Sequence, residues 1–464
     1  MTRRSLLAAT AVGITAGTGR AVAAPQGQLT YGGHVSLAPA WFDPGEAAGG
    51  ITPYMLLYGL HDALLKAMPG NNQAPSLAES VLASVAAVET ADAQHLRFRL
   101  REPWPDFLTF YVGVCGAAWI VPRKYVTQVG NDGFKKAPIG VGPYRYVSFT
   151  PGVELVLEAF EPYWRNPPSV KRLVLKVIPD ESTRLAALKR GEIDIAYSIR
   201  GELAGELQQT PGLILKPVVV QGTVCVYFAD QWDPKSPWHD QRVRLAASLA
   251  IDRKTINDVL TMGLSHVTGN SIVPDMYEFY WQPPTPIYDP AEARQLLAGA
   301  GYPNGFDAGF YFCDSSFANI AEAVVNNLGE VGIRAKLRPI ERAAFNKAYA
   351  EKAYKNLIQG GTAAFGNAAT RLESQVVHGG PYVYGSYPDI DALFPVQAVE
   401  PDHGRREAIL HQTQQMAHER TIFAPIWQNA IINGVGPRVA ESGFGRIPGF
   451  PYTAPFEELA LKSG

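Results

Sequence analysis

Residues 173–195, LVLKVIPDESTRLAALKRGEIDI, decide the fold class of this chain. The apolar and β-branched run at 173–178 predicts a strand, and Pro179-Asp180-Glu181 predicts the start of a helix. Gly191 stands where that helix would end, and Ile193-Asp194-Ile195 resumes a strand-like alternation. A strand, a helix and a strand in this order predict a right-handed crossover between neighbouring parallel strands, which is typical of an α/β protein.

The same α/β pattern continues along the chain. Asp289 supplies an N-cap, Pro290 takes the first helical position, and Glu292 is the acidic residue of a capping box. An apolar face follows, and Gly301 stands where the helix would end, so these residues predict a helix over residues 289–301. Further helices are predicted at residues 240–250, 318–328 and 405–418, and a further strand at residues 331–337.

Size and composition indicate a large globular protein. The 464 residues suggest two or three structural units, and 47% apolar with 18% charged residues is ordinary for a chain with a sizeable interior. The net charge of -2 gives no basic excess that would attract phosphates, so nucleic acid is not an expected partner. After the first two dozen residues, no stretch reaches the roughly eighteen consecutive apolar residues of a membrane helix.

The first 24 residues read as a leader that carries no fold. Arg3 and Arg4 precede a weakly apolar run at 6–18, and Ala21-Val22-Ala23-Ala24 resembles a cleavage site. The paired arginines are typical of a twin-arginine signal, with an ordinary secretory signal as the alternative. Because no cysteine follows the cut site, we expect a free periplasmic protein without a lipid anchor.

Cysteines and catalytic patterns point away from a disulfide scaffold and from an enzyme. Cys115, Cys225 and Cys313 lie far apart, so at most one pair could bridge, and buried single thiols are expected. The sequence has no G-x-S-x-G, no H-E-x-x-H, no phosphate loop and no paired-cysteine metal pattern. His411 and His418 are seven apart with no obvious third ligand. We therefore predict no catalytic residue, no metal and no cofactor.

Aromatic side chains are the more informative group. They lie in segments that also hold Gly, Pro and Thr. Segments of this composition can line a cleft in which a ligand is buried against the flat aromatic rings. For each residue taken singly, packing in the core is the alternative. The group comprises Tyr54, Tyr58, Trp119, Tyr227, Phe228, Trp232, Phe365, Tyr384 and Trp427.

A series of short motifs, in a fixed order, resembles one protein family. These motifs are APIGVGPYR at 137–145, Tyr163-Trp164, IPDESTR at 178–184, LKRGEID at 188–194, DQRVR at 240–244, AIDR at 250–253, Tyr302-Pro303 after the 289–301 helix, Val331-Gly332-Ile333 and APIW at 424–427. Together they resemble the extracellular solute-binding proteins of family 5, which include dipeptide- and oligopeptide-binding components of ABC importers. The resemblance runs from about Leu29 to beyond Tyr452.

The resemblance implies a two-lobe, Venus-flytrap architecture with two crossing strands and a smaller subdomain inserted in the N-terminal lobe. The first lobe would comprise residues 25–50, 155–265 and 435–464, the inserted subdomain residues 51–154, and the second lobe residues 266–434. Such a protein captures a peptide-like or other small polar solute, closes over it and delivers it to a permease in the inner membrane. A monomer is expected.

Two departures from the family pattern stand out. Between Ser80 and Val81 the chain lacks several dozen residues that relatives carry in the inserted subdomain, which would leave a sheet edge exposed. In the second lobe, peptide-binding relatives hold the amino terminus of the peptide with an aspartate, where this chain has Ala364, and a second aspartate falls at Asn367. Because a buried ammonium group needs a compensating charge, a zwitterionic peptide held in the usual way is disfavoured.

The resemblance also suggests which residues line the cleft. Arg371 could hold a carboxylate or phosphate through its planar guanidinium, with a plain surface arginine as the alternative. Two other function classes stay open: an exported hydrolase acting on a peptide or ester, and a ligand-sensing protein without a transport role. The candidate ligand contacts are Tyr54 and Trp119 from the first lobe, and Thr362, Phe365, Asn367, Arg371 and Trp427 from the second.

Overall fold

The computed structural model describes residues 24–34, 37, 42, 54–62, 65–68, 71–75, 85–90, 96–107, 119–267, 271–361 and 366–463. Several features predicted from the sequence lie outside these ranges. They are the leader, the point of shortening at Ser80 and Val81, Cys115, and the two candidate ligand contacts Thr362 and Phe365.

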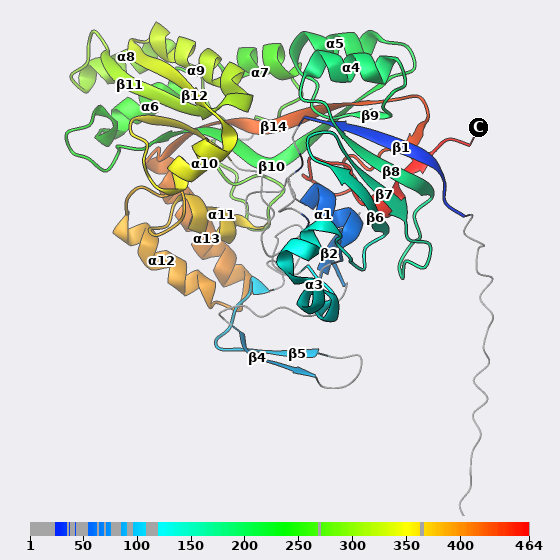
Figure 1. Cartoon of the computed structure of the whole chain (residues 1–464). Coiled ribbons are helices and arrows are strands. Elements are labelled where there is room, and N and C mark those ends of the chain that lie inside the picture. Colours follow the sequence, from blue (N-terminus) through cyan, green and yellow to red (C-terminus); the bar gives the residue numbers. More distant parts are fainter. Residues whose placement is uncertain are drawn as a thin grey trace, which may run out of the picture.

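One ten-stranded mixed sheet runs through the molecule in the order β12-β11-β13-β10-β14-β9-β1-β8-β7-β6. Its two long central strands, β10 and β14, pair antiparallel and join the two halves of the chain (Figure 1). The strands are β1 Gln26–Gly33, β6 Tyr144–Thr150, β7 Glu154–Ala159, β8 Val170–Val177, β9 Ile195–Ala196, β10 Ile214–Phe228, β11 Phe306–Asp314, β12 Ile333–Ile340, β13 Leu357–Gly360 and β14 Phe423–Val435.

In the second half, helices cover both faces of the sheet. Because side chains of a strand alternate between faces, Val224 and Val226 of β10 enter one core while Cys225 and Tyr227 enter the other. The first core contains residues of α6 (Gln241–Leu249), α7 (Arg253–Thr261), α8 (Pro290–Gly299) and α9 (Ala318–Glu330). The second contains residues of α10 (Arg342–Ala350), α11 (Ala368–Gln375), α12 (Pro388–Ala398) and α13 (His403–Glu419).

The first half has its own cores on β1, β8 and β9. Helices α4 (Glu181–Lys189) and α5 (Gly201–Gln209) pack in a cluster that includes Ile193 and Ile432. The opposite face holds Leu29, Tyr31 and Leu173 together with residues of α1 (Tyr54–Leu60). In Figure 1, α4 and α5 lie above this part of the sheet, and α1 and α3 (Arg123–Lys136) lie below it.

The predicted crossover at residues 173–195 forms, with one correction. Strand β8, helix α4 and strand β9 follow each other, and Asp180 caps α4 by accepting from the Thr183 amide. However, β8 and β9 are not neighbours, because β1 lies between them and pairs parallel with both. Asp194 fixes this order, since its Oδ2 accepts from the Thr30 amide of β1 at 2.8 Å.

The other predicted elements are confirmed with small shifts of their ends. The helices expected at 240–250, 289–301, 318–328 and 405–418 are α6, α8, α9 and α13, and the strand expected at 331–337 is β12. Asp289 caps α8 by accepting from the amides of Ala291 and Glu292. Local capping therefore marks the start of α8, as the sequence predicted.

Between α1 and α3 the described strands form two separate hairpins. Strands β2 (Leu65–Met68) and β3 (Asn71–Pro75) make one two-stranded sheet, and β4 (Val85–Thr90) and β5 (Leu96–Leu100) make another. A third small sheet pairs β15 (Val439–Glu441) with β16 (Ala460–Leu461). Short 3-10 helices are η3 (Pro237–His239), η4 (Ser315–Phe317) and η5 (Phe456–Glu458).

The edge strand of the large sheet is basic, and the described cysteines are buried. At one end of the large sheet, β12 carries Arg334, Lys336 and Arg338 at alternate, exposed positions. Cys225 and Cys313 are free and buried as expected, and burial raises the pKa of each thiol to about 12. Within the described ranges, none of the helices has the length and apolar character needed to cross a bilayer.

Buried Arg184 ties together the strand ends of the first half. Its guanidinium donates to the carbonyls of Ile178, Pro179, Tyr197 and Ser198 at 2.6–2.9 Å. We expect Arg184→Met to lower the free energy of unfolding by about 3 kcal/mol or more, because it leaves these carbonyls without their charged donor. Urea titration followed by circular dichroism measures the change.

The exposed Arg190, at the end of the same helix, is the matched control. Arg190→Met should change the free energy of unfolding by no more than about 0.5 kcal/mol. Similar losses for the two variants would contradict the role assigned to Arg184.

Candidate functional site

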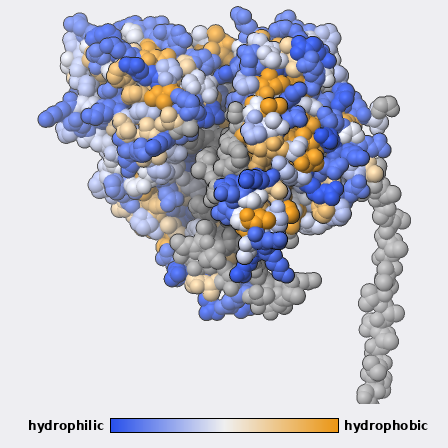
Figure 2. Space-filling view, in the orientation of Figure 1, coloured by the Kyte–Doolittle hydropathy of each residue, from blue (hydrophilic) through white to orange (hydrophobic). Residues whose placement is uncertain are grey.

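The carboxyl ends of the parallel strands from the two halves meet at one junction. His34 follows β1 and Tyr197 follows β9, while Asp314 ends β11 and Arg342 follows β12. The guanidinium of Arg200 donates to the Ser316 carbonyl at 2.6 Å and so links the halves directly. In Figure 2 the two halves of the molecule lie on either side of this junction. In α/β proteins, this end of the strands is where ligands bind.

Aromatic rings form the first-half side of the junction. Tyr197 is stacked between His34, with ring centroids 5.0 Å apart, and Tyr452, at 4.9 Å. Burial, and secondarily the positive charge of Arg342, lowers the pKa of His34 to about 3. His34 is therefore neutral at physiological pH, and the stack presents no charge.

A break in the central ladder lies next to this stack. Val219 pairs with Ala430 and Thr223 pairs with Gln428, so three residues of β10 oppose Asn429 alone. Such a bulge frees backbone groups from the ladder. Within it, the Gln221 carbonyl accepts from Arg371 Nη2 at 3.1 Å and from the Tyr277 hydroxyl at 3.4 Å.

The bulge also contacts the C-terminal segment of the chain. The Gln221 amide nitrogen donates to the Gly449 carbonyl at 3.2 Å, and its Nε2 donates to the Pro448 carbonyl at 3.0 Å. Residue 221 thus connects α11 of the second half with the segment that carries Tyr452. This junction is the candidate functional site.

Two of the predicted ligand contacts come together here. Asn367 and Arg371 lie one turn apart at the start of α11, where Asn367 is the N-cap and forms a capping box with Thr370. Both side chains are buried, so the alternative of a surface arginine at position 371 is wrong. Arg371 holds the bulge through Gln221, a role that the sequence did not indicate.

The other predicted contacts are placed differently. Trp119 is buried and packs edge-on against Tyr58, with ring centroids 5.7 Å apart. Trp427 is 1% exposed, lies in the second-half core beside α6, and donates from Nε1 to Asn429 Oδ1 at 3.3 Å. Tyr54 begins α1. For these three residues a contact with ligand stays a prediction.

A buried ion pair that sequence reasoning missed joins the segment after β5 to the second half. The Asp106 carboxylate accepts from Asn367 Nδ2 at 2.5 Å and pairs with Arg406 of α13. Arg406 also donates to Gln397 Oε1 at 3.1 Å and lies over the Phe279 ring. Asp106 ends the motif REPWPD, but no local pattern connects it to a residue 300 positions later.

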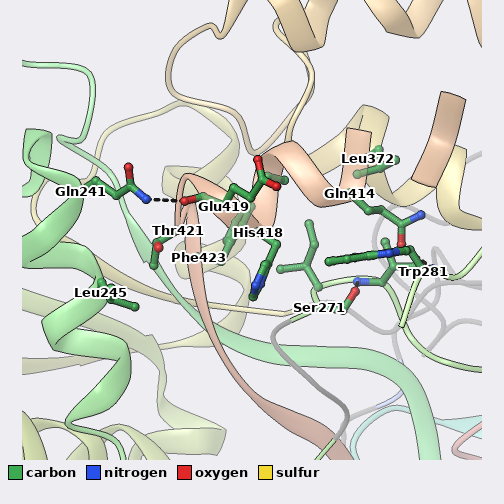
Figure 3. A pocket seen from close by; sticks show the side chains of 13 residues that line it. Gln241, Leu245, Ser271, Trp281, Leu372, Gln414, His418, Glu419, Thr421 and Phe423 are labelled. Carbon is green, nitrogen blue, oxygen red and sulfur yellow. Dashed lines mark hydrogen bonds between the residues drawn. The ribbon is translucent and has the colours of Figure 1, made fainter. Parts of the chain in front are cut away.

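A separate pocket of about 250 Å³ lies within the second half (Figure 3). It is bounded by the start of α6, the segment from Ser271 to Trp281 and the end of α13. His418 lines it, whereas His411 faces Glu407 one turn away on α13. Nowhere in the described part of the chain do three or more His, Cys, Asp or Glu side chains gather as a metal site.

A family model for bacterial extracellular solute-binding proteins, family 5, matches residues 62–381. The chain belongs to this family. This family 5 protein is 25% identical over 321 residues to heme-binding protein A of Haemophilus influenzae, and 25% identical over 264 residues to the glutathione-binding protein GsiB of Salmonella choleraesuis. The matches cover 66% and 56% of this chain, but only 58% and 50% of those relatives.

Solved structures share the fold over nearly the whole chain. The ABC transporter substrate-binding protein CtaP of Listeria monocytogenes superposes with a TM-score of 0.79 at 18% identity, covering 94% of this chain and 99% of that one. DppA of Helicobacter pylori, in complex with the peptide STSA, gives 0.78 at 18% identity, covering 94% and 98%. The family 5 protein therefore has the two-lobe architecture of periplasmic binding proteins.

The Asp106–Arg406 pair should contribute strongly to the stability of this family 5 protein. Arg406→Met leaves the buried Asp106 carboxylate without its countercharge, which costs about 3 kcal/mol or more in the free energy of unfolding. In the ligand-free variant, the radius of gyration from X-ray scattering should also rise, because the contact between the segment after β5 and α13 is lost. Arg405→Met is the control, since Arg405 is exposed and pairs with Glu400. Equal effects of the two substitutions would refute this role.

Two buried histidines make the folded state sensitive to acid. Burial lowers the pKa of His61 to about 4, and that of His34 to about 3. The unfolded chain, with a histidine pKa of about 6.5, takes up protons first, so stability falls as pH drops below about 6.5. Each histidine should cost about 1.4 kcal/mol at pH 5.5 relative to pH 7.5.

Urea titrations at the two pH values measure this loss of stability. His34→Gln should remove about half of it. The same acid sensitivity in the His34→Gln variant and the parent would show that His34 does not contribute.

Proposed function

We propose that this protein is the substrate-binding component of an ABC importer, which captures a small solute between its lobes and delivers it to a permease in the inner membrane. The observation that carries the proposal is the junction at the β10 bulge, where the strand ends of both lobes meet across two shared strands. Membership of the family and the fold shared with substrate-binding proteins support it.

The physical logic of transport follows from this geometry. A solute that contacts both lobes stabilises the closed arrangement in proportion to its differential affinity for that arrangement. Two strands with an interrupted ladder can bend there at lower cost than a continuous sheet. The permease then recognises the closed form, which the bound solute stabilises.

The limits of the lobes are part of the proposal. We place the first lobe at residues 25–50, 155–265 and 435–464, the inserted subdomain at 51–154 and the second lobe at 266–434. The shared core of α6 and α7 with α8 and α9 favours an earlier start for the second lobe, before Gln241.

Export to the periplasm by the leader at residues 1–24 belongs to the same proposal. The paired arginines favour the twin-arginine route, which carries folded proteins. We also propose that the protein acts as a monomer without a cofactor and that it catalyses no reaction. Family members and structural neighbours described as binding proteins support the last point.

Binding and closure can be measured together on the full chain. A solute at a hundred times its dissociation constant should add about 2.7 kcal/mol of stability, which thermal-shift screening detects. The same solute should lower the radius of gyration in X-ray scattering. Mass spectrometry should recover the solute unchanged.

Two outcomes would favour the other function classes. A covalent change in the recovered solute would indicate the exported hydrolase. Binding by a chain whose gene lies apart from any permease and ATPase genes would indicate a ligand sensor instead.

A further inference from the structure

The charged side chains described at the junction have ionic or hydrogen-bonding partners within the protein. Asp314 pairs with Arg342 at 2.7 Å, Glu181 pairs with Arg200, and Asp106 pairs with Arg406. Arg371 and Arg184 donate to backbone carbonyls, and His34 is neutral. Each of these charged side chains therefore already makes at least one ionic or hydrogen-bonding contact within the protein.

Neutral polar groups at the same junction are not satisfied. The hydroxyls of Thr223 and Tyr349, the Gln375 Nε2 and the Gln221 Oε1 are buried, and none of these four atoms has a hydrogen-bond partner in the described structure. Their residues are only 2–4% exposed. A buried polar atom without a partner costs about 1–3 kcal/mol, so four such atoms in one region call for a common explanation.

The four groups belong to adjoining elements. Gln221 and Thr223 are two residues apart in β10, at the bulge, and strand alternation puts them on the face that also carries Cys225. Gln375 lies one helical turn beyond Arg371, whose Nη2 reaches the Gln221 carbonyl. The Tyr349 hydroxyl lies next to Gly360, the strand partner of Cys225.

The aromatic stack of the first lobe adjoins this polar group. Pro448 and Gly449 contact Gln221, and Tyr452 of the same segment stacks on Tyr197. The junction thus combines neutral donors and acceptors on one side with flat rings on the other. Aromatic faces beside neutral hydrogen-bonding groups suit a ligand with both an apolar surface and uncharged polar groups.

A second observation concerns position 367, which carries an uncharged amide side chain. Asn367 occupies the start of α11, and its Nδ2 donates to Asp106. The amide therefore serves to hold the inserted segment, and no carboxylate at this position faces a ligand cation. A ligand ammonium group would meet an amide at this position, and the nearby Asp106 carboxylate is already paired with Arg406.

We propose that the junction binds an uncharged polar molecule, carrying hydroxyl or amide groups and at least one flat apolar face, through Thr223, Tyr349, Gln375 and Gln221. This inference rests on the proposed capture of a solute between the lobes and names the chemical class of that solute. The ligand supplies the hydrogen bonds that these four side chains lack.

Four probes separate the possible chemistries: sucrose as an uncharged polyol, N-acetyl-dialanine amide as an uncharged amide, dialanine as a zwitterion and glutarate as a dianion. Each is added at 10 mM to the full chain, and the melting temperature and the heat of binding are measured. At least one uncharged probe should bind, and its affinity should change less than two-fold between 0.05 and 0.5 M NaCl. Charged probes should bind at least ten-fold more weakly.

Substitutions distinguish a ligand contact from an ordinary buried residue. Thr223→Val and Tyr349→Phe should each weaken binding of the uncharged probe at least five-fold. Neither should lower the melting temperature of the free protein, because the removed hydroxyl has no partner to lose. Tyr125→Phe is the control, since the Tyr125 hydroxyl donates to the Ala137 carbonyl at 2.8 Å on another part of the molecule, and probe affinity should not change.

The results separate this inference from the proposed function. Binding of dialanine or glutarate without binding of either uncharged probe would overturn the ligand class and leave solute capture intact. If none of the four probes binds, solute capture itself is contradicted for these chemistries, and the inference fails with it. Unchanged probe affinity in both hydroxyl variants would refute the assigned contacts.

Discussion

The antiparallel pairing of β10 with β14 is the interaction on which the rest of the structure depends. These strands place the two lobes in one continuous sheet, so the carboxyl ends of both sets of parallel strands meet at one place. The bulge around Gln221 interrupts the pairing at that same place. Backbone groups released there are bound by Arg371 from one lobe and by the segment at Gly449 from the other.

Much of the fold could be predicted from local sequence, because its signals are local. Asp180, Asp240 and Asp289 cap helices within three residues of themselves, and apolar periodicity marks the strands. The order of strands could not be read in this way. β1 enters between β8 and β9 from more than 130 residues away, where it pairs with both strands and its Thr30 amide donates to Asp194.

The candidate site was predicted only in part, for a related reason. Family resemblance drew attention to Asn367 and Arg371, and both lie at the junction. Their partners, Asp106 and Gln221, come from segments 261 and 150 positions away and carry no motif that links them. A side chain chosen as a ligand contact can equally bind the protein itself, and only its three-dimensional neighbours decide between the two.

The outer strand β12 has a consequence for contacts between copies of this protein. An unpaired strand edge is a template for adding another chain. With Arg334, Lys336 and Arg338 along it, a second molecule approaching edge to edge would bring two rows of positive charge together. Repulsion between the two rows opposes this edge-to-edge self-association.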